Sequence, residues 1–238
     1  MRQKKYRYKN LLFLAEGVKI VSEILESHYR VQHLIATKEY ADRFCGKNEI
    51  PCSIASPAQM KTLSQLSTPP GIIAVVSIPE LHFDESKLGK TTLVLDNLTD
   101  PGNLGTIIRT ADWFGIQNIL CSPGTVDLYN PKTIQATMGS FTRVNIYQLP
   151  LEKALKQLQN RFIVLALDMH GTPIHQIEPN KPKLIITGSE SAGISPELKH
   201  LIDKYISIPS HYNQRNNGPE SLNASIATAI ACYILTED

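Results

Sequence analysis

Three short apolar segments, each followed by a polar loop, constrain the fold of this chain more than any other feature. Residues 92–95, 183–187 and 206–209 read Thr-Leu-Val-Leu, Lys-Leu-Ile-Ile-Thr and Ile-Ser-Ile-Pro, the composition of buried strands. Helical patterns follow the first and third loops. Buried strands that alternate with helices predict an α/β fold, and open α/β sheets bind ligands at the carboxyl ends of their strands. We therefore expect the three loops to form a ligand site.

The first loop is built like the entrance to a helix. Residues 100–102, Asp-Pro-Gly, have turn chemistry, and Asn103 is a good N-cap for the helix that follows. The apolar positions that recur at helical spacing are Leu104, Ile107, Ile108 and Ala111. Arg109 falls beside this stripe, so the pattern predicts a guanidinium group near the strand ends.

The other two loops have different features. Residues 188–193, Gly-Ser-Glu-Ser-Ala-Gly, contain glycines that let the backbone approach a ligand closely. This segment lacks the Gly-x-Gly start of a dinucleotide fingerprint, which argues against NAD. The third loop leads to residues 221–223, Ser-Leu-Asn, where a long apolar helix is predicted to begin with Ser221 at an N-cap position.

Together and in this order, the three segments resemble the three motifs of the SpoU/TrmH family of RNA ribose 2′-O-methyltransferases, within the SPOUT superfamily. The first motif is met by Asp100, Pro101, Asn103, Gly105, Arg109 and Ala111. The second is met by Gly188, Glu190 and Gly193, and the third by Ile208, Pro209, Ser221, Leu222 and Asn223. The resemblance covers the chain from about Thr91 to its C-terminus.

The resemblance implies a fold, a reaction and an assembly. The implied fold is α/β, with a C-terminal trefoil-knotted SPOUT methyltransferase domain. The implied reaction transfers a methyl group from S-adenosyl-L-methionine (AdoMet) to a ribose 2′-hydroxyl of rRNA or tRNA. The implied assembly is a homodimer through the knotted domain. General topology rules argue against a knot as a prior expectation, so the knot depends on the resemblance alone.

The resemblance also implies roles for the motif residues. The implied catalytic residues are Arg109, Asn103, Ser221, Asn223 and Glu190, and the implied cofactor-binding residues are Gly188, Ile208 and Leu222. Two roles are open for Arg109. It is either the base that removes the hydroxyl proton, or a cation that holds an RNA phosphate and polarises the hydroxyl, since guanidinium groups are nearly always charged.

Several of these residues also have a purely structural interpretation. Helix capping is the alternative role for Asn103 and Ser221. Core packing is the alternative for Ile208 and Leu222, and it is compatible with cofactor contact. Glu190 either orients catalytic groups or braces its own loop.

The first 80 residues predict a smaller α/β domain. The predicted helices are 15–27, 40–44 and 57–66, and the predicted strands are 31–36, 52–54 and 71–76. Residues 79–91 are polar and contain proline, glycine and mixed charge, which is typical of a linker. The predicted domains are therefore 1–80 and 91–238.

The N-terminal domain resembles, more loosely, the RNA substrate-binding domain that often precedes SpoU cores. The resemblance rests on Glu16-Gly17, which follow an apolar run, and on residues 67–72. Such domains often carry a further N-terminal helical stretch, so part of the RNA-binding surface is expected to be absent here.

Basic residues crowd the start of the chain. The segment contains Arg2, Lys4, Lys5, Arg7 and Lys9, with Tyr6 and Tyr8 between them. Lysine and arginine neutralise phosphates and tyrosine stacks on unpaired bases, so the segment is a candidate RNA contact. The alternative is a solvated, frayed terminus, and the formal net charge of +2 is too small to decide between them.

Other features exclude several classes of protein. No apolar run approaches the roughly 20 residues that cross a bilayer, and the N-terminus lacks a signal peptide's apolar core, so we expect a cytoplasmic protein that binds no membrane. The four cysteines form no Cys-x-x-Cys pair, so we expect reduced thiols. His170 and His175 lie in a turn-rich stretch without partners at metal spacing, so we expect surface residues and no metal site.

Two other functions share some of these features. A knotted methyltransferase that modifies a base is disfavoured by Arg109 together with Ser221-Leu222-Asn223. A non-catalytic RNA-binding protein would bind no cofactor, which the second and third motifs argue against. The sequence does not specify the RNA or the nucleotide, because ribose is the same at every position. It also leaves open whether the long loop at residues 211–220 contacts RNA through Arg215 or is simply mobile.

Overall fold

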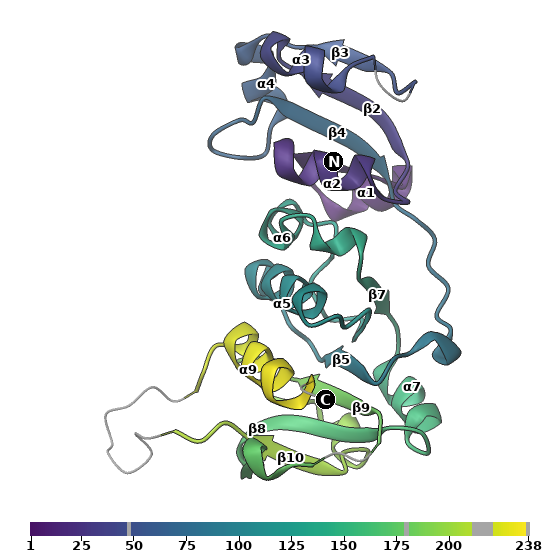
Figure 1. Cartoon of the computed structure of the whole chain (residues 1–238), viewed down its shortest axis with the longest axis vertical. Helices are drawn as coiled ribbons and strands as arrows, with labels where there is room; N and C mark the ends of the chain where they lie inside the picture. Colours follow the sequence, from purple (N-terminus) through teal and green to yellow (C-terminus); the bar gives the residue numbers. More distant parts are fainter. Residues whose placement is uncertain (47–48, 179–180, 211–220, 237–238) are drawn as a thin grey trace. The chain divides into compact units, whose positions relative to one another are not determined.

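The computed structural model describes the chain except for residues 47–48, 179–180, 211–220 and 237–238 (Figure 1). The prediction about Arg215 and its loop lies outside the described residues. The chain forms two compact units. The N-terminal unit comprises residues 1–81 and 127–143, and the C-terminal unit comprises residues 82–126 and 144–238.

The N-terminal unit is built around a four-stranded sheet with the order β1-β4-β2-β3. Its elements in chain order are α1 (Lys4–Asn10), β1 (Leu12–Glu16), α2 (Val18–Leu25), β2 (Val31–Ala36), α3 (Lys38–Phe44), β3 (Cys52–Ile54), α4 (Pro57–Leu63), β4 (Ile72–Ser77), α6 (Pro131–Thr137) and a 3₁₀ turn, η2 (Ser140–Thr142). Strand β4 is antiparallel to both neighbours, and β2 and β3 are parallel.

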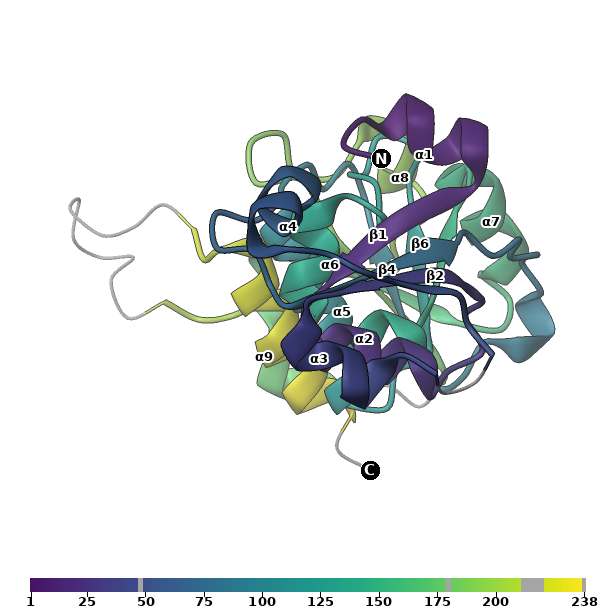
Figure 2. The same ribbon diagram turned by 90° about the horizontal axis from the view of Figure 1, so that it is seen from above.

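Apolar residues on both faces of this sheet are covered by helices. Figure 2 shows α2 and α3 on one side of the sheet and α4 on the other. On the α4 side, Met60 packs with Ala55 and Ile73. Helix α4 begins with a capping box, in which the Ser56 hydroxyl and the Gln59 side chain each accept a hydrogen bond from the other residue's backbone N–H.

The start of this unit differs from the sequence prediction. A helix was expected over residues 15–27, but residues 12–16 form strand β1 and the helix spans only Val18–Leu25. Gly17 separates the two elements with a φ of 98°, a conformation that a side chain disfavours. The strands expected at 31–36 and 52–54 are confirmed.

Residues 127–143 join the N-terminal unit through a buried ion pair. The Arg7 guanidinium donates hydrogen bonds to one carboxylate oxygen of Asp127, from Nε at 3.1 Å and from Nη2 at 2.5 Å. The half-buried Tyr8 hydroxyl donates to the other oxygen at 2.7 Å, and burial followed by this contact raises the pKa of Tyr8. The ring of Phe13 packs against Tyr129. Arg7, a member of the expected RNA-binding segment, is therefore held inside the protein, whereas Tyr8 stays exposed with its hydroxyl bound to Asp127.

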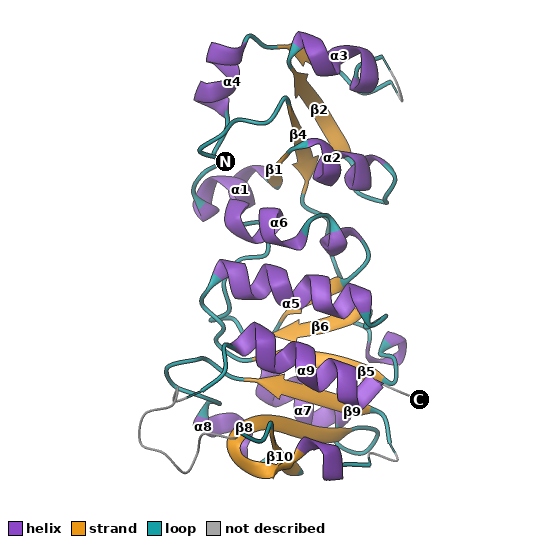
Figure 3. Ribbon diagram, turned by 60° about the vertical axis from the view of Figure 1, so that its left-hand side comes forward, coloured by secondary structure: helices purple, strands orange, loops and turns teal. Residues whose placement is uncertain are grey.

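The C-terminal unit contains a six-stranded sheet with the order β10-β8-β9-β5-β6-β7, and every neighbouring pair is parallel. Its elements are η1 (Glu85–Lys87), β5 (Thr91–Leu95), α5 (Pro101–Trp113), β6 (Asn118–Cys121), β7 (Asn145–Gln148), α7 (Leu151–Leu158), β8 (Ile163–Pro173), η3 (Ile174–Gln176), β9 (Lys183–Thr187), α8 (Pro196–Lys199), β10 (Lys204–Ser207) and α9 (Ala224–Thr236). Helices α5 and α9 pack together over one face of the sheet, and α7 lies behind it (Figure 3). The predicted α/β fold is confirmed.

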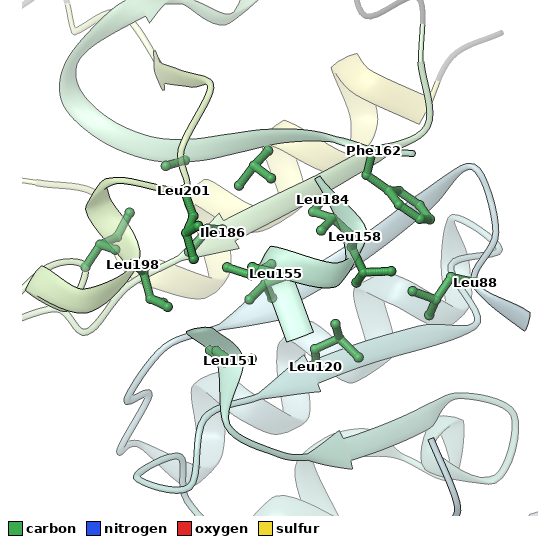
Figure 4. Packing of buried hydrophobic residues seen from close by; sticks show 14 of the residues in the cluster. Leu88, Leu120, Leu151, Leu155, Leu158, Phe162, Leu184, Ile186, Leu198 and Leu201 are labelled. Carbon is green, nitrogen blue, oxygen red and sulfur yellow. The ribbon is translucent and has the colours of Figure 1, made fainter. Parts of the chain in front are cut away.

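The central strands are continuous apolar runs because helices bury both of their faces. Leu151, Leu155 and Leu158 of α7 insert between Leu120 and Leu184 of the sheet and the residues around α8 (Figure 4). This cluster includes almost every apolar side chain of α7, so the helix contributes one complete buried face.

The predicted strands are found with small shifts, but one long strand was missed. Strand β9 has the expected bounds, whereas the third strand begins two residues earlier than expected and spans Lys204–Ser207. The stretch around His170, interpreted as turn-rich, continues β8 as far as Pro173. Here Gly171 lies so close to β10 that a Cβ would be 2.5 Å from the Ile206 nitrogen.

The cysteines require a correction. Cys45 and Cys52 form a disulfide with their Cα atoms 5.6 Å apart, whereas reduced thiols were expected. Their spacing of seven residues does not predict a disulfide, because the end of α3 and the start of β3 come together only in the folded unit. Among the described residues no three potential metal ligands cluster. None of the helices found there is long and apolar enough to cross a bilayer.

Candidate functional site

The first loop begins its helix differently from the prediction. Asp100, not Asn103, is the N-cap of α5, and its carboxylate accepts a hydrogen bond from the Asn103 backbone N–H at 2.7 Å. Pro101 occupies the first helical position, where its missing N–H costs nothing. Because Asp100 caps the helix, the Asn103 side chain is available for other contacts.

Three motif side chains meet at the ends of β5 and β9 and at the start of α9. Glu190 Oε1 accepts hydrogen bonds from the side-chain nitrogens of Asn103 and Asn223, both at 2.9 Å. The same Asn223 nitrogen donates to the Asn103 side-chain oxygen, also at 2.9 Å. Glu190 Oε1 further accepts the Ala224 backbone N–H at 3.2 Å. Glu190, Asn103 and Asn223 are called the polar trio below.

Asn223 also begins helix α9. Its side-chain oxygen accepts hydrogen bonds from the backbone N–H groups of Ser225, at 3.0 Å, and Ile226, at 3.3 Å. Asn223 therefore performs the capping role that was predicted for Ser221. Ser221 is exposed, two residues ahead of the cap. Because capping holds the Asn223 side-chain oxygen against α9, the nitrogen of the same amide points away from the helix and toward Glu190.

The glycines of the second loop have a local steric explanation. Ser189 and Gly193 exchange two backbone hydrogen bonds, of 3.0 and 2.8 Å, that fold the loop tightly. A Cβ on Gly188 would lie 2.5 Å from the carbonyl carbon and oxygen of Gly193. The loop can therefore close only with glycine at position 188. The closed loop places Glu190 beside Asn103 and Asn223.

A buried carboxylate secures the far end of this loop. Asp96 directly follows β5, is 1% exposed, and accepts hydrogen bonds from both the backbone N–H and the hydroxyl of Ser195. The backbone contact measures 2.7 Å. The other Asp96 oxygen accepts the side-chain amide of Asn97 at 3.0 Å. Sequence reasoning missed Asp96 and Ser195, although an acidic residue immediately after a buried strand was a usable signal.

A pocket of about 360 Å³ opens beside the polar trio. Its lining includes Glu190, Ser221 and all three predicted cofactor-binding residues, Gly188, Ile208 and Leu222. Ser189 and Gly193, from the loop expected to approach a ligand, also line it. The rest of the wall was not predicted and is formed by Leu167, Asp168, Met169, His170, Thr187, Ile194, Ile206, Ala224 and Ala227. The pocket has the volume and mixed apolar and polar lining of a small-molecule site.

Arg109 lies apart from these contacts. It is exposed, it does not line the pocket, and among the described residues its guanidinium has no hydrogen bond or ion pair. The buried stripe of α5 beside it is confirmed, with Leu104, Ile107, Ile108 and Ala111 all in the core. The site therefore consists of the hydrogen-bonded polar trio and the adjoining pocket, and Arg109 lies outside both.

Family models match both parts of the chain. The model described as "SpoU rRNA Methylase family" matches residues 90–233. The model described as "MRM3-like substrate binding domain" matches residues 1–74.

Relatives and solved structures match nearly the whole chain. The 23S rRNA (guanosine(2553)-2′-O)-methyltransferase RlmP of Bacillus subtilis is 31% identical, over 99% of this chain and 92% of that protein. The structure of a putative RNA methyltransferase of the TrmH family from Porphyromonas gingivalis has a TM-score of 0.87 and 33% identity, over 98% of this chain and 92% of that one. An AdoMet-bound rRNA methyltransferase from Sinorhizobium meliloti has a TM-score of 0.84 and 28% identity, over 98% and 90%.

Proposed function

This chain belongs to the SpoU rRNA methylase family, and we propose that it methylates a ribose 2′-hydroxyl of ribosomal RNA with AdoMet as the methyl donor. The observation that carries the proposal is the polar trio beside the pocket, because it joins all three motifs in one site. Ribosomal RNA is preferred to tRNA because the B. subtilis relative, which matches over 99% of this chain, acts on 23S rRNA. Because ribosomal RNA is the proposed substrate, we also propose that the enzyme acts in the cytoplasm.

The pocket residues fit AdoMet. Ile208 and Leu222 give the apolar surface that an adenine ring requires, and Gly188 leaves its backbone accessible at the pocket wall. We assign cofactor binding to these three residues. When bound, AdoMet supplies a methyl group on a positively charged sulfur.

The proposed reaction is a displacement by the ribose oxygen. The 2′-oxygen attacks the methyl carbon, the sulfur–carbon bond breaks, and the hydroxyl proton passes to water. Such a step requires the two reactants to be held in contact. Glu190 and Asn103 hold the loops of the site in one arrangement. Asn223 completes the polar trio that fixes the start of α9, and Ser221, which is exposed and lines the pocket, is assigned the contact to the incoming ribose.

Arg109 is assigned to the RNA. An exposed guanidinium without a protein partner is free to hold a phosphate with two parallel hydrogen bonds. It remains charged, so it also stabilises the negative charge that develops on the 2′-oxygen. This assignment selects the phosphate-binding role of Arg109 over the role of a base.

RNA recognition is assigned to residues 1–80 and catalysis to residues 91–238. Helix α1 supports the first assignment, because Lys4, Lys5 and Lys9 are exposed although Arg7 is not. Exposed lysines neutralise phosphates without selecting a sequence. The exposed Tyr6 adds an aromatic surface for an unpaired base.

Helix α9 supports a homodimer through the C-terminal unit. An apolar stripe that is only partly buried runs along it at helical spacing through Ile226, Ala229, Ile230, Tyr233 and Ile234. Trp113, at the end of the neighbouring helix α5, is 85% exposed. A helix that is apolar all round is normally buried, and exposed apolar patches mark contact sites. The dimer is therefore proposed to form over α9, and the C-terminal unit to carry the family's trefoil knot.

One experiment tests the reaction and its substrate together. The purified protein is incubated with methyl-labelled AdoMet and either rRNA or tRNA from a strain that lacks its gene, and the RNA is digested to nucleosides. Label in a 2′-O-methylnucleoside from rRNA is the expected result. A labelled base would identify a base methyltransferase, and label in tRNA alone would overturn the choice of substrate. Light scattering of the same preparation measures the proposed dimer, which a Tyr233→Glu variant should dissociate.

A further inference from the structure

The pocket wall carries an uneven charge. Its described lining residues include the carboxylates of Asp168 and Glu190 and no lysine or arginine. His170 is the remaining titratable side chain of the wall. Two carboxylates without a lysine or arginine in the wall favour a ligand with positive charge.

The two carboxylates are not equally available. Glu190 accepts three hydrogen bonds at Oε1, from Asn103, Asn223 and Ala224, so protein donors offset more of its charge than of the charge on Asp168. Asp168 lies on β8 and its Oδ1 accepts only the His170 backbone N–H, at 2.8 Å, among the described residues. Its other oxygen is free to face a ligand. The strand backbone and this one contact hold the carboxylate at the wall.

The methyl donor and its product differ mainly in charge. AdoMet has a sulfonium, whereas S-adenosylhomocysteine, the product, has a neutral thioether. Adenine, ribose and the amino-acid end are common to both molecules. Contacts to those common groups bind donor and product equally, so they cannot favour release of the product. A carboxylate near the sulfur distinguishes the two, because Coulomb attraction acts only on the donor.

We infer that Asp168 is a specificity-determining residue that makes the pocket prefer the cationic donor to the neutral product. This inference rests on the proposed function, since it requires the pocket to hold AdoMet. The methyl transfer removes the positive charge and with it the attraction to Asp168. The reaction itself therefore weakens the binding of its own product, and the site is cleared for the next donor.

Titration calorimetry of the full-length protein with each molecule tests the inference without measuring turnover. The variant is Asp168→Asn, which keeps the shape of the side chain and removes its charge. The matched control is Glu197→Gln, which removes an exposed carboxylate of α8 that does not line the pocket. Since Asp168 is exposed, Asp168→Asn should weaken AdoMet binding by about two- to fivefold and leave product binding unchanged. The difference should shrink at high salt.

The outcomes separate this inference from the function on which it rests. If the wild-type protein binds neither molecule, the proposed function fails. If it binds both, and Asp168→Asn weakens both equally, Asp168 contacts a group common to the two and the charge discrimination is wrong. Unchanged affinity for both molecules would also overturn it. An effect of the same size in Glu197→Gln would assign the preference to the general field of the protein instead of Asp168.

Discussion

The side-chain nitrogen of Asn223 donates a hydrogen bond to the side-chain oxygen of Asn103, which lies 120 residues earlier in the chain, and both amides donate to the same oxygen of Glu190. Each asparagine uses its nitrogen as a donor toward one acidic group. The arrangement requires amide donors at the asparagines and a carboxylate acceptor at Glu190. Exchanging an amide for a carboxylate, or the reverse, therefore tests it.

Asn103→Asp should impair both the fold and the reaction. The substitution removes a donor and places a second negative charge beside Glu190, which should lower stability by about 1 kcal/mol and turnover at least tenfold. Adding Glu190→Gln restores a donor between the two positions, so the double variant should recover part of both losses. Thermal unfolding and single-turnover methylation measure the two effects. A double variant no better than Asn103→Asp would contradict the proposed pairing.

Asp96→Asn should loosen the second loop from β5. An amide turns one carboxylate oxygen into a donor, so either the two Ser195 donors or the Asn97 side-chain amide lose their acceptor beside a buried group, which should cost about 1–3 kcal/mol. Ser195→Ala removes only the hydroxyl contact and should cost less. Urea unfolding gives the stabilities, and AdoMet affinity reports the loop, which lines the pocket. Equal stability of Asp96→Asn and the wild type would show that the contact does not hold the loop.

Arg109→Ala should separate catalysis from cofactor binding. Because Arg109 is exposed and does not line the pocket, its loss should leave stability and AdoMet affinity unchanged. Turnover on RNA should fall about 100-fold or more, since a positioned cation is lost. Arg109→Lys should recover only part of it, because an ammonium cannot form the bidentate contact. Near-normal turnover of Arg109→Ala would remove this residue from the mechanism.

Arg7→Ala should destabilise the N-terminal unit more than any exposed cation does. It leaves the buried Asp127 carboxylate without its partner, a change that typically costs about 3–5 kcal/mol. Lys4→Ala, on the same helix but exposed, is the matched control and should have little effect. Chemical unfolding monitored by circular dichroism compares the two. If both variants unfold at the same denaturant concentration as wild type, the ion pair is not needed to retain residues 127–143.

The buried cysteines should resist alkylation in the native protein. Burial raises the pKa of the Cys121 and Cys232 thiols to about 12, and only the thiolate is nucleophilic, so both stay protonated and unreactive at pH 8. Reduction of the disulfide should expose Cys45 and Cys52 to iodoacetamide while the other two remain unlabelled. Mass spectrometry of the digested protein identifies the labelled sites. Rapid native labelling of Cys121 would contradict its burial.

The parts of the fold that follow local patterns were predictable. The strands at 31–36 and 183–187 were predicted with their observed bounds. The second is a continuous apolar run because both of its faces are buried, whereas the first is only partly buried and admits Gln32 and His33. The motif spacing also indicated that Asn103, Glu190 and Asn223 belong to one site. Their hydrogen bonds were not predictable, since the caps of α5 and α9 decide where each amide points.

The parts that depend on distant contacts were not predictable. Residues 169–173 read as a turn, but pairing with β10 makes them a strand, and this strand supplies the pocket wall that contains Asp168. The basic segment at the N-terminus was interpreted as an RNA contact without knowledge of Asp127, which lies 120 residues after Arg7 and holds it inside the unit. Charge along a sequence does not reveal which cations are already neutralised.

The position of residues 127–143 in the chain has a consequence for synthesis on the ribosome. Protein domains generally fold as units in the order in which they emerge, and the first 81 residues would ordinarily be complete once they leave the exit tunnel. Here Asp127, Tyr129 and helix α6 must arrive before that unit can bury Arg7 and Phe13. By then β5, α5 and β6 of the second unit have already been made. The growing chain therefore holds two unfinished folds at once. The first can be completed only after the intervening residues 82–126 and then residues 127–143 have been synthesised.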